Sequence, residues 1–271
     1  MRKNTLIITT LALALLLTSM VSCAPAKTAK SGGNYTDEMK IPYGADLSPN
    51  DGADSVEREG DHIDSPYFSA LDFFNMTDTE TLTILHNFKT QQQTSEWSCG
   101  VSTALMTLEW YSKLDGNDEL SLSEFRKASS YDADGLPGGS APSATSLQQM
   151  IDIFEGFGGF DIYSTFDCAE NVYDVFTLAY IRETLQAGNP VLVGWNDWGG
   201  HWQVIIGYDT MGTEFESDDV IIVADPYDTT DHNQDGYGVY GAERFIYNFT
   251  FYNFFAEEEL NDMAFLVVTP K

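Results

Sequence analysis

The types and spacing of Gln93 and Cys99 suit catalysis by a cysteine nucleophile. Cys99 opens an apolar stretch that repeats at three- and four-residue steps, so we expect a helix that begins there. The first N–H groups of a helix lack partners and carry partial positive charge, which favours a thiolate, the nucleophilic form of cysteine. Gln93 lies just upstream. Its amide could stabilise an oxyanion together with the Cys99 backbone N–H, provided that a base is also present.

His201 is the best candidate for that base among the four histidines. It follows Gly199-Gly200 and opens a predicted strand, so another backbone can approach it closely at the edge of a sheet. The alternative is a histidine that fills a polar niche. The other histidines lie in a polar N-terminal stretch, before the Cys99 helix and in an acidic loop, at positions His62, His86 and His232.

Asp225 is the candidate that would orient His201. Residues 201–208 and 220–225 are predicted strands on either side of a polar loop, residues 209–219. If they form a hairpin, residues whose numbers sum to about 426 lie opposite each other. His201 then lies within a residue or two of Asp225. A carboxylate beside an imidazole fixes its tautomer and stabilises its charged form, so the sequence predicts a Cys99, His201 and Asp225 set.

The elements that must position these residues change type along the chain. We expect helices near Asp72 or Thr77, over 99–113, from Ser121, over 145–156 and over 173–187. We expect strands over 191–195, 202–208, 220–224 and 264–268, with a fifth in the aromatic stretch 245–255. Helices come first and an antiparallel sheet second, which is the α+β pattern.

The N-terminal part is predicted to lie outside the folded domain. Residues 1–23 have a basic start, a short apolar core and Met20-Val-Ser-Cys23, which resembles a bacterial lipoprotein signal with Cys23 as the acylated residue. Ordinary secretion is the alternative, because Met20 replaces the usual leucine. Residues 24–70 are polar and rich in glycine and proline, so we expect a flexible acidic stalk. The folded domain is then residues 71–271.

The net charge limits which binding partners are expected, and the cysteine content limits which disulfides can form. The formal charge of −29 makes nucleic acid and anionic membrane surfaces poor partners, whereas a basic peptide, a divalent cation or simply a solvated surface fits. If Cys23 carries lipid, the remaining cysteines are Cys99 and Cys168. A disulfide between them is the structural alternative to a reactive Cys99.

A second candidate site follows Asp225. Residues 231–237 place oxygen ligands at alternate positions and a glycine at Gly236, as a calcium-binding loop does. The match is partial because the twelfth position is Ala242, and the same composition forms ordinary turns. The predicted ligands of a structural calcium are Asp231, Asn233, Asp235 and Tyr237, with Asp228 and Glu243 as further candidates.

Three motifs in this order resemble a known family. They are Gln93-Thr-Ser-Glu-Trp-Ser-Cys99-Gly100, then Gly200-His201-Trp202, then Ala224-Asp225-Pro226. Over roughly residues 84–269 the chain is similar to the papain-like peptidases that process bacteriocin leaders after a double glycine. The resemblance implies a papain-like fold with Cys99 as nucleophile, His201 as base, Asp225 as orienter and Gln93 in the oxyanion hole. Val101 stands where proline is frequent in the family.

The resemblance also departs from the family in context. Bacteriocin exporters carry membrane helices and an ATPase with a phosphate-binding loop, and this sequence has neither. It looks more like the free-standing secreted members. We therefore expect an extracytoplasmic, lipid-anchored or secreted cysteine peptidase that acts on a peptide or protein, requires no cofactor, binds no nucleic acid and meets the membrane only through its lipid. The alternatives are an amidase or transglutaminase-like acyl transferase with the same triad, and a non-catalytic surface lipoprotein, with or without bound calcium.

Overall fold

The computed structural model describes residues 38–42, 52–53, 62, 64–126, 145–168, 171–229, 231–249 and 263–271. The predicted signal segment and Cys23 lie outside these residues. No helix in the described part of the chain is long and apolar enough to cross a membrane.

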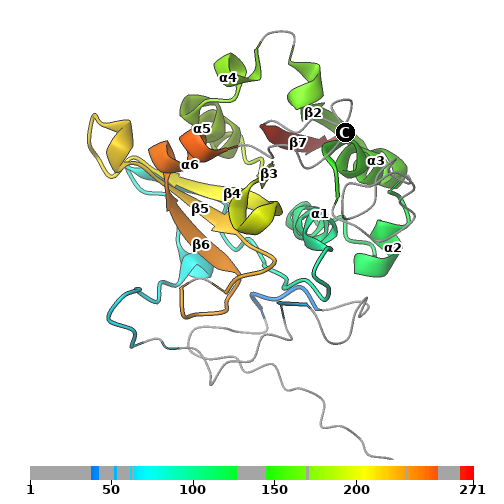
Figure 1. Ribbon diagram of the computed structural model, residues 1–271, viewed down its shortest axis with the longest axis horizontal. Coiled ribbons are helices and arrows are strands. Elements are labelled where there is room, and N and C mark those ends of the chain that lie inside the picture. Colours follow the sequence, from blue (N-terminus) through cyan, green and yellow to red (C-terminus); the bar gives the residue numbers. More distant parts are fainter. Residues whose placement is uncertain are drawn as a thin grey trace, which may run out of the picture. The chain divides into compact units, whose positions relative to one another are not determined.

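The described strands β1 to β7 form one antiparallel sheet (Figure 1). Its order is β2-β7-β3-β4-β5-β6, and β1 also pairs with β4. The strands are β1 (Leu82–Ile84), β2 (Phe160–Ser164), β3 (Val191–Trp195), β4 (His201–Asp209), β5 (Val220–Ala224), β6 (Tyr237–Gly241) and β7 (Ala264–Pro270). Strand β4 lies at the centre of this arrangement and is the strand that carries His201.

Helices pack against this sheet and bury its central strand. They are α1 (Cys99–Trp110), α2 (Glu119–Ser123), α3 (Leu147–Phe157), α4 (Val172–Val175), α5 (Leu178–Gln186) and α6 (Ala242–Asn248). Short 3₁₀ turns are η2 (Phe73–Asn75), η3 (Thr165–Asp167), η4 (Asp197–Gly199) and η5 (Glu216–Asp218). Helices α1 and α5 both contact β4, and α3 contacts β7 and β2. Because two helices cover it, β4 is buried from its first residue to its eighth. The predicted α+β arrangement is confirmed.

Two predicted elements near the ends of the domain are wrong. The helix expected near Asp72 or Thr77 is only the turn η2, which Asp72 caps by accepting a hydrogen bond from the Asn75 N–H. The strand expected over 245–255 is in its described part the helix α6 and the residue after it. Aromatic residues favour strands, but in this helix the ring of Phe245 packs against Trp195 and Phe249. Tertiary packing therefore overrides the local preference.

Two predicted helices have different boundaries in the structure. Helix α2 begins before Ser121, because Asp118 is its N-cap and Ser121 completes the capping box. The helix expected over 173–187 is interrupted between α4 and α5. There Thr177 takes an extended conformation and accepts a hydrogen bond from the Tyr180 N–H, which starts a new helix.

Part of the predicted stalk packs on the domain. Met39 and Ile41 are buried, and Lys40 pairs with Thr90 in a parallel bridge. Ala53 N donates a hydrogen bond of 2.9 Å to the Gln93 carbonyl oxygen. A Cβ on Gly52 would lie 2.3 Å from the Thr94 carbonyl carbon, so only glycine fits there. Two buried apolar side chains and backbone hydrogen bonds attach these residues to the domain, whereas the sequence predicted a flexible stalk.

Candidate active site

Cys99 is the first residue of α1, as the sequence predicted, and it is 4% exposed. Its neighbour Ser98 is the N-cap residue, and its backbone carbonyl accepts the Ser102 N–H at 2.9 Å. Within the described residues the Ser98 side chain makes no capping hydrogen bond. The positive end of the helix therefore faces the Cys99 thiol without a side-chain cap, which favours an anion there.

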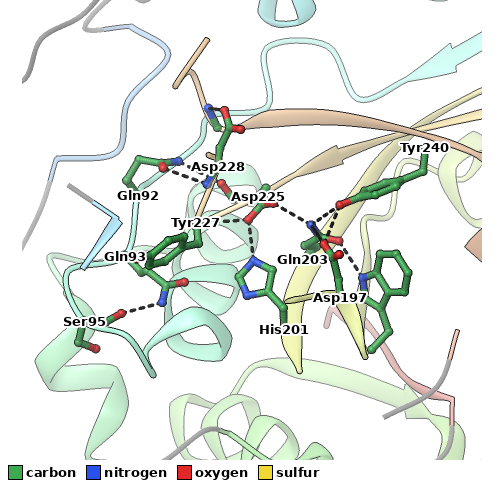
Figure 2. Close-up of polar contacts among 12 residues, drawn as sticks. Gln92, Gln93, Ser95, Asp197, His201, Gln203, Asp225, Tyr227, Asp228 and Tyr240 are labelled. Carbon is green, nitrogen blue, oxygen red and sulfur yellow. Dashed lines mark hydrogen bonds and ion pairs between the residues drawn. The ribbon is translucent and has the colours of Figure 1, made fainter. Parts of the chain in front are cut away.

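His201 opens β4 and lies beside Asp225, the residue that directly follows β5 (Figure 2). Nε2 of His201 and Oδ1 of Asp225 are 2.6 Å apart, and both residues are 4% exposed. Gly200, just before His201, has a φ of 114°, a conformation that favours glycine. The structure thus brings together the two residues that the hairpin argument paired.

The register that produces this contact differs from the predicted one. Tyr208 pairs with Ile221, three residues beyond its predicted partner, and Val204 pairs with Ala224, two residues beyond. An irregularity between Ile205 and Gly207 changes the pairing along β4. The pairing between β4 and β5 ends at Val204 and Ala224, so His201 lies beyond the paired part of β4. Its side chain reaches Asp225, which lies beyond the paired part of β5.

The side chain of Cys99 lies near the same imidazole ring. This side chain is near enough to help raise the pKa of His201, while the ring is hydrogen-bonded to Asp225. Because Nε2 faces Asp225, Nδ1 is the nitrogen left for the thiol. An imidazole between a thiol and a carboxylate can take the thiol proton and hold it, since the carboxylate stabilises the imidazolium.

The electrostatics favour the charged form of both His201 and Asp225. Burial lowers the pKa of His201, but the charge and hydrogen bond of Asp225 and the nearby Cys99 outweigh it and raise this pKa to about 10. Burial likewise raises the pKa of Asp225, but the charge of His201 and hydrogen bonds from His201, Tyr227 and Gln203 outweigh it, so the pKa lies below its ordinary value. The pair is therefore an imidazolium and a carboxylate over a wide pH range.

Asp225 is fixed by more than His201, through residues that sequence reasoning missed. Its Oδ1 accepts the Tyr227 N–H at 2.8 Å, and its Oδ2 accepts Gln203 Nε2 at 2.8 Å. Gln203 Nε2 also lies 3.1 Å from the Tyr240 hydroxyl, which donates to Asp197 at 2.7 Å. Figure 2 shows Gln203, Tyr240 and Asp197 on one side of Asp225 and Tyr227 on the other. This network holds the carboxylate toward the imidazole.

Gln92 fixes the turn after Asp225 from the other side. Its Nε2 donates to the Asp225 carbonyl at 3.0 Å, and its Oε1 accepts the Asp228 N–H at 3.2 Å. The amide therefore bridges both ends of this turn. The one local signal in the sequence is that Gln92 lies in the Gln91-Gln-Gln93 run next to the cysteine motif.

Gln93 lies next to the Asp225 turn, with its amide engaged. Its backbone N–H donates to the Pro226 carbonyl at 2.7 Å. Its Nε2 donates to the Ser95 carbonyl at 2.6 Å, which uses one of two protons, and its buried Oε1 has no partner among the described residues. Gln93 is thus anchored near Asp225, and one amide proton is available for a further acceptor.

The disulfide alternative is not formed, because Cys99 and Cys168 are both free thiols. Cys168 instead contacts Tyr163 and the Ser164 carbonyl oxygen. The Cys99 thiol is therefore not used in a disulfide with Cys168.

The predicted calcium ligands form a polar loop whose carboxylates accept backbone N–H groups. Asp231 accepts from Asn233 N at 3.0 Å, Asp235 from Tyr237 N at 3.0 Å and Asp228 from Gly236 N at 3.0 Å. The Tyr237 hydroxyl points away to the Phe88 carbonyl. Among the described residues no three or more His, Cys, Asp or Glu side chains are arranged to hold a metal ion. The loop therefore has the hydrogen bonds of ordinary turns.

Comparison with protein families decides the class to which this arrangement belongs. Residues 85–251 match the Peptidase_C39 like family. The chain belongs to this family. The match includes all four predicted site residues and the sheet strands that carry His201 and precede Asp225. A search of curated proteins found no match. The predicted resemblance and the α+β, papain-like fold are confirmed, and the membership indicates cysteine peptidase chemistry.

Proposed function

We propose that this protein is a cysteine peptidase that hydrolyses peptide bonds through Cys99, His201 and Asp225. The observation that carries the proposal is the His201 ring, which is hydrogen-bonded to the buried carboxylate of Asp225 and has the Cys99 side chain, at a helix start, near enough to raise its pKa. A polar niche for a histidine requires no thiol at that position. A peptidase requires all three groups in this order.

The reaction follows from the positions of these groups. The Cys99 thiolate attacks the scissile carbonyl carbon, and the oxyanion that forms accepts hydrogen bonds from the Cys99 N–H and the second Nε2 proton of Gln93. The intermediate collapses as the His201 imidazolium gives its proton to the leaving amine, which leaves a thioester on Cys99. His201 then takes a proton from water, which attacks the thioester and releases the carboxylic acid and the free thiol.

The test is to incubate the protein with a diverse peptide pool beside a Cys99→Ala variant and to sequence the new termini by mass spectrometry. Removing the thiol removes the nucleophile, so we expect new termini with the wild type and none with the variant. If an added amine is incorporated at the new carbonyl ends in preference to water, acyl transfer replaces hydrolysis as the function. New termini that are the same with both proteins would show that Cys99 is not the nucleophile, and no new termini with either protein would leave only a binding role.

We also propose that the protein acts outside the cytoplasm, held to a membrane by an acyl chain on Cys23 or secreted without one. Support comes from the sequence of the N-terminal segment alone, which lies outside the described residues. The mass of the N-terminal peptide tests this proposal, because acylation increases it and simple cleavage does not.

A structural calcium in the loop of residues 228–237 stays a prediction. Burial and the negative charges of Asp231, Asp225 and Asp235 make the ionised form of Asp228 unfavourable and raise its pKa, and a bound cation would offset this repulsion. If calcium binds the folded protein, it should raise the melting temperature by about 5 °C over a chelator control, and Asp235→Asn should remove this response. Equal melting temperatures in calcium and in chelator would rule the site out.

A further inference from the structure

Glu119 is a buried carboxylate that the proposed reaction does not use. It is the first residue of α2 and is 0% exposed. None of the ion pairs among the described residues includes it. Burying a carboxylate without a cation is unfavourable unless hydrogen bonds satisfy its oxygens. The identity of its donors therefore indicates what this residue is for.

Among the described residues, the four hydrogen-bond donors to Glu119 all come from the segment around Cys99. Oε1 accepts from the Thr94 N–H at 3.2 Å and from the hydroxyls of Ser98 and Ser102, each at 2.8 Å. Oε2 accepts from the Thr94 hydroxyl at 2.7 Å. Burial raises the pKa of Glu119, and these hydrogen bonds oppose that shift because they stabilise the ionised carboxylate. Glu119 thus fixes Thr94, directly after Gln93, and Ser98, directly before Cys99.

The bond to Ser98 changes how α1 begins. A serine at the N-cap normally accepts a hydrogen bond from an N–H of the first turn. Here its hydroxyl donates to Glu119 instead, and no side-chain cap forms within the described residues. The N–H groups at the start of α1, including that of Cys99, therefore have no competitor in the Ser98 side chain.

The Gln93 amide belongs to the same group of hydrogen bonds. Gln93 Nε2 donates to the Ser95 carbonyl at 2.6 Å, and the Ser98 hydroxyl lies 3.4 Å from that same oxygen. Thr94, between Gln93 and Ser95, is held to Glu119 by its backbone and its side chain. A single carboxylate therefore connects both ends of the loop that carries the two proposed oxyanion donors.

We propose that Glu119 is a positioning residue, which holds Thr94 and Ser98 so that the Gln93 amide and the Cys99 N–H stay aimed at the oxyanion. The inference rests on the proposed function, because an oxyanion forms only when Cys99 attacks a carbonyl. Glu119 touches neither the substrate nor the thiol in this role. It acts through the geometry of the loop.

The test compares Glu119→Gln with the wild type, using the full chain and 4-nitrophenyl acetate. Thiolate attack releases 4-nitrophenolate and leaves an acetyl thioester, which water hydrolyses to acetate. Glutamine has the same size, but its nitrogen turns one acceptor position into a donor and so reverses one bond to the loop. We expect kcat to fall about tenfold with KM within about twofold, since the loss is confined to the transition state. Glu124→Gln, which neutralises an exposed glutamate after the same helix, is the matched control and should match the wild type.

Alkylation of Cys99 separates positioning from a general structural role. Iodoacetamide reacts at a tetrahedral carbon and forms no oxyanion, so its rate at Cys99 should stay within about twofold in Glu119→Gln. If Glu119 acts through Ser98, Ser98→Ala alone should lower kcat. The double variant should then be hardly slower than the slower single variant.

Each outcome of these measurements decides the proposal. A selective loss of kcat with intact alkylation and non-additive variants supports it. Unchanged kcat in Glu119→Gln, beside a wild type whose activity requires Cys99, overturns the role of Glu119 and leaves the peptidase proposal standing. Parallel loss of kcat, alkylation and melting temperature would show a purely structural role. A wild type no faster than Cys99→Ala would overturn both proposals.

Discussion

Replacing His201 with alanine is expected to lower the kcat of Cys99-dependent hydrolysis about 10⁴-fold. The variant loses the ring that is hydrogen-bonded to Asp225 and lies near Cys99, and with it the base for the thiol and the acid for the leaving amine. Alkylation of Cys99 near neutral pH should slow in parallel, because no group takes the thiol proton. Mass spectrometry of the Cys99 peptide measures this rate without interference from Cys168.

His86→Ala is the matched control for this experiment. His86 is exposed, and its Nδ1 lies 2.9 Å from the Met76 carbonyl oxygen, away from the site. The His86→Ala variant also loses an imidazole but keeps Cys99, His201 and Asp225, so its kcat should equal that of the wild type. If His201→Ala kept more than about a tenth of the activity, His201 would not be the general base.

The second large effect is on stability, in Asp225→Ala. The carboxylate is buried and accepts hydrogen bonds from the His201 ring, the Tyr227 N–H and Gln203. Its removal leaves these donors without an acceptor and a buried imidazolium without its counter-charge. We expect the free energy of unfolding to fall by about 3–5 kcal/mol near neutral pH, as measured by denaturant titration.

The pH dependence of this loss has a definite sign. The pKa of His201 rises from 6.5 to about 10 on folding, so its stabilising contribution is complete below pH 6.5 and disappears as the pH rises through 10. The pKa of Asp225 falls below 3.8, so its contribution is complete above pH 3.8 and disappears in stronger acid. The difference between wild type and Asp225→Ala should therefore be larger at about pH 5.5 than at about pH 9.5.

Asp225→Asn is the comparison that separates charge from hydrogen bonding. Its amide oxygen can still accept from the His201 ring and the Tyr227 N–H, but its nitrogen faces the Gln203 donor. We expect a loss smaller than that of Asp225→Ala and with weaker pH dependence. A loss in Asp225→Ala that is the same at both pH values would contradict the imidazolium–carboxylate pair.

The elements around the site were predictable where a local pattern is strong. Helix α1 begins at Cys99 because the apolar repeat begins there, and β3, β4 and β5 follow from short apolar runs bounded by turns. The strands β1, β2 and β6 were missed because they are short and partly exposed, so their residues show little apolar pattern. The residues after Gly241 form a helix because of packing that no local rule contains.

The supporting residues of the site were not predictable, because their partners lie far along the chain. Gln92 bonds to Asp225, Gln203 to Asp225 and Glu119 to Thr94 and Ser98. A buried glutamine or glutamate has the same local sequence signal as an exposed one. The irregularity between Ile205 and Gly207 changes the register along β4, and the assumption of a regular hairpin did not include it, although a glycine inside a strand is a signal of such a shift.

The sequence by itself determined which groups are available for chemistry: a cysteine at a helix start, a histidine at a strand start, an aspartate after the next strand and a glutamine before the cysteine. Residue type and local periodicity are enough for that, because both are properties of a short stretch of chain. Only the tertiary structure decided that His201 lies 2.6 Å from Asp225 and near Cys99, and that the buried Glu119 is hydrogen-bonded to Thr94 and Ser98. Distances and burial depend on how separate segments pack, and packing is a property of the whole fold.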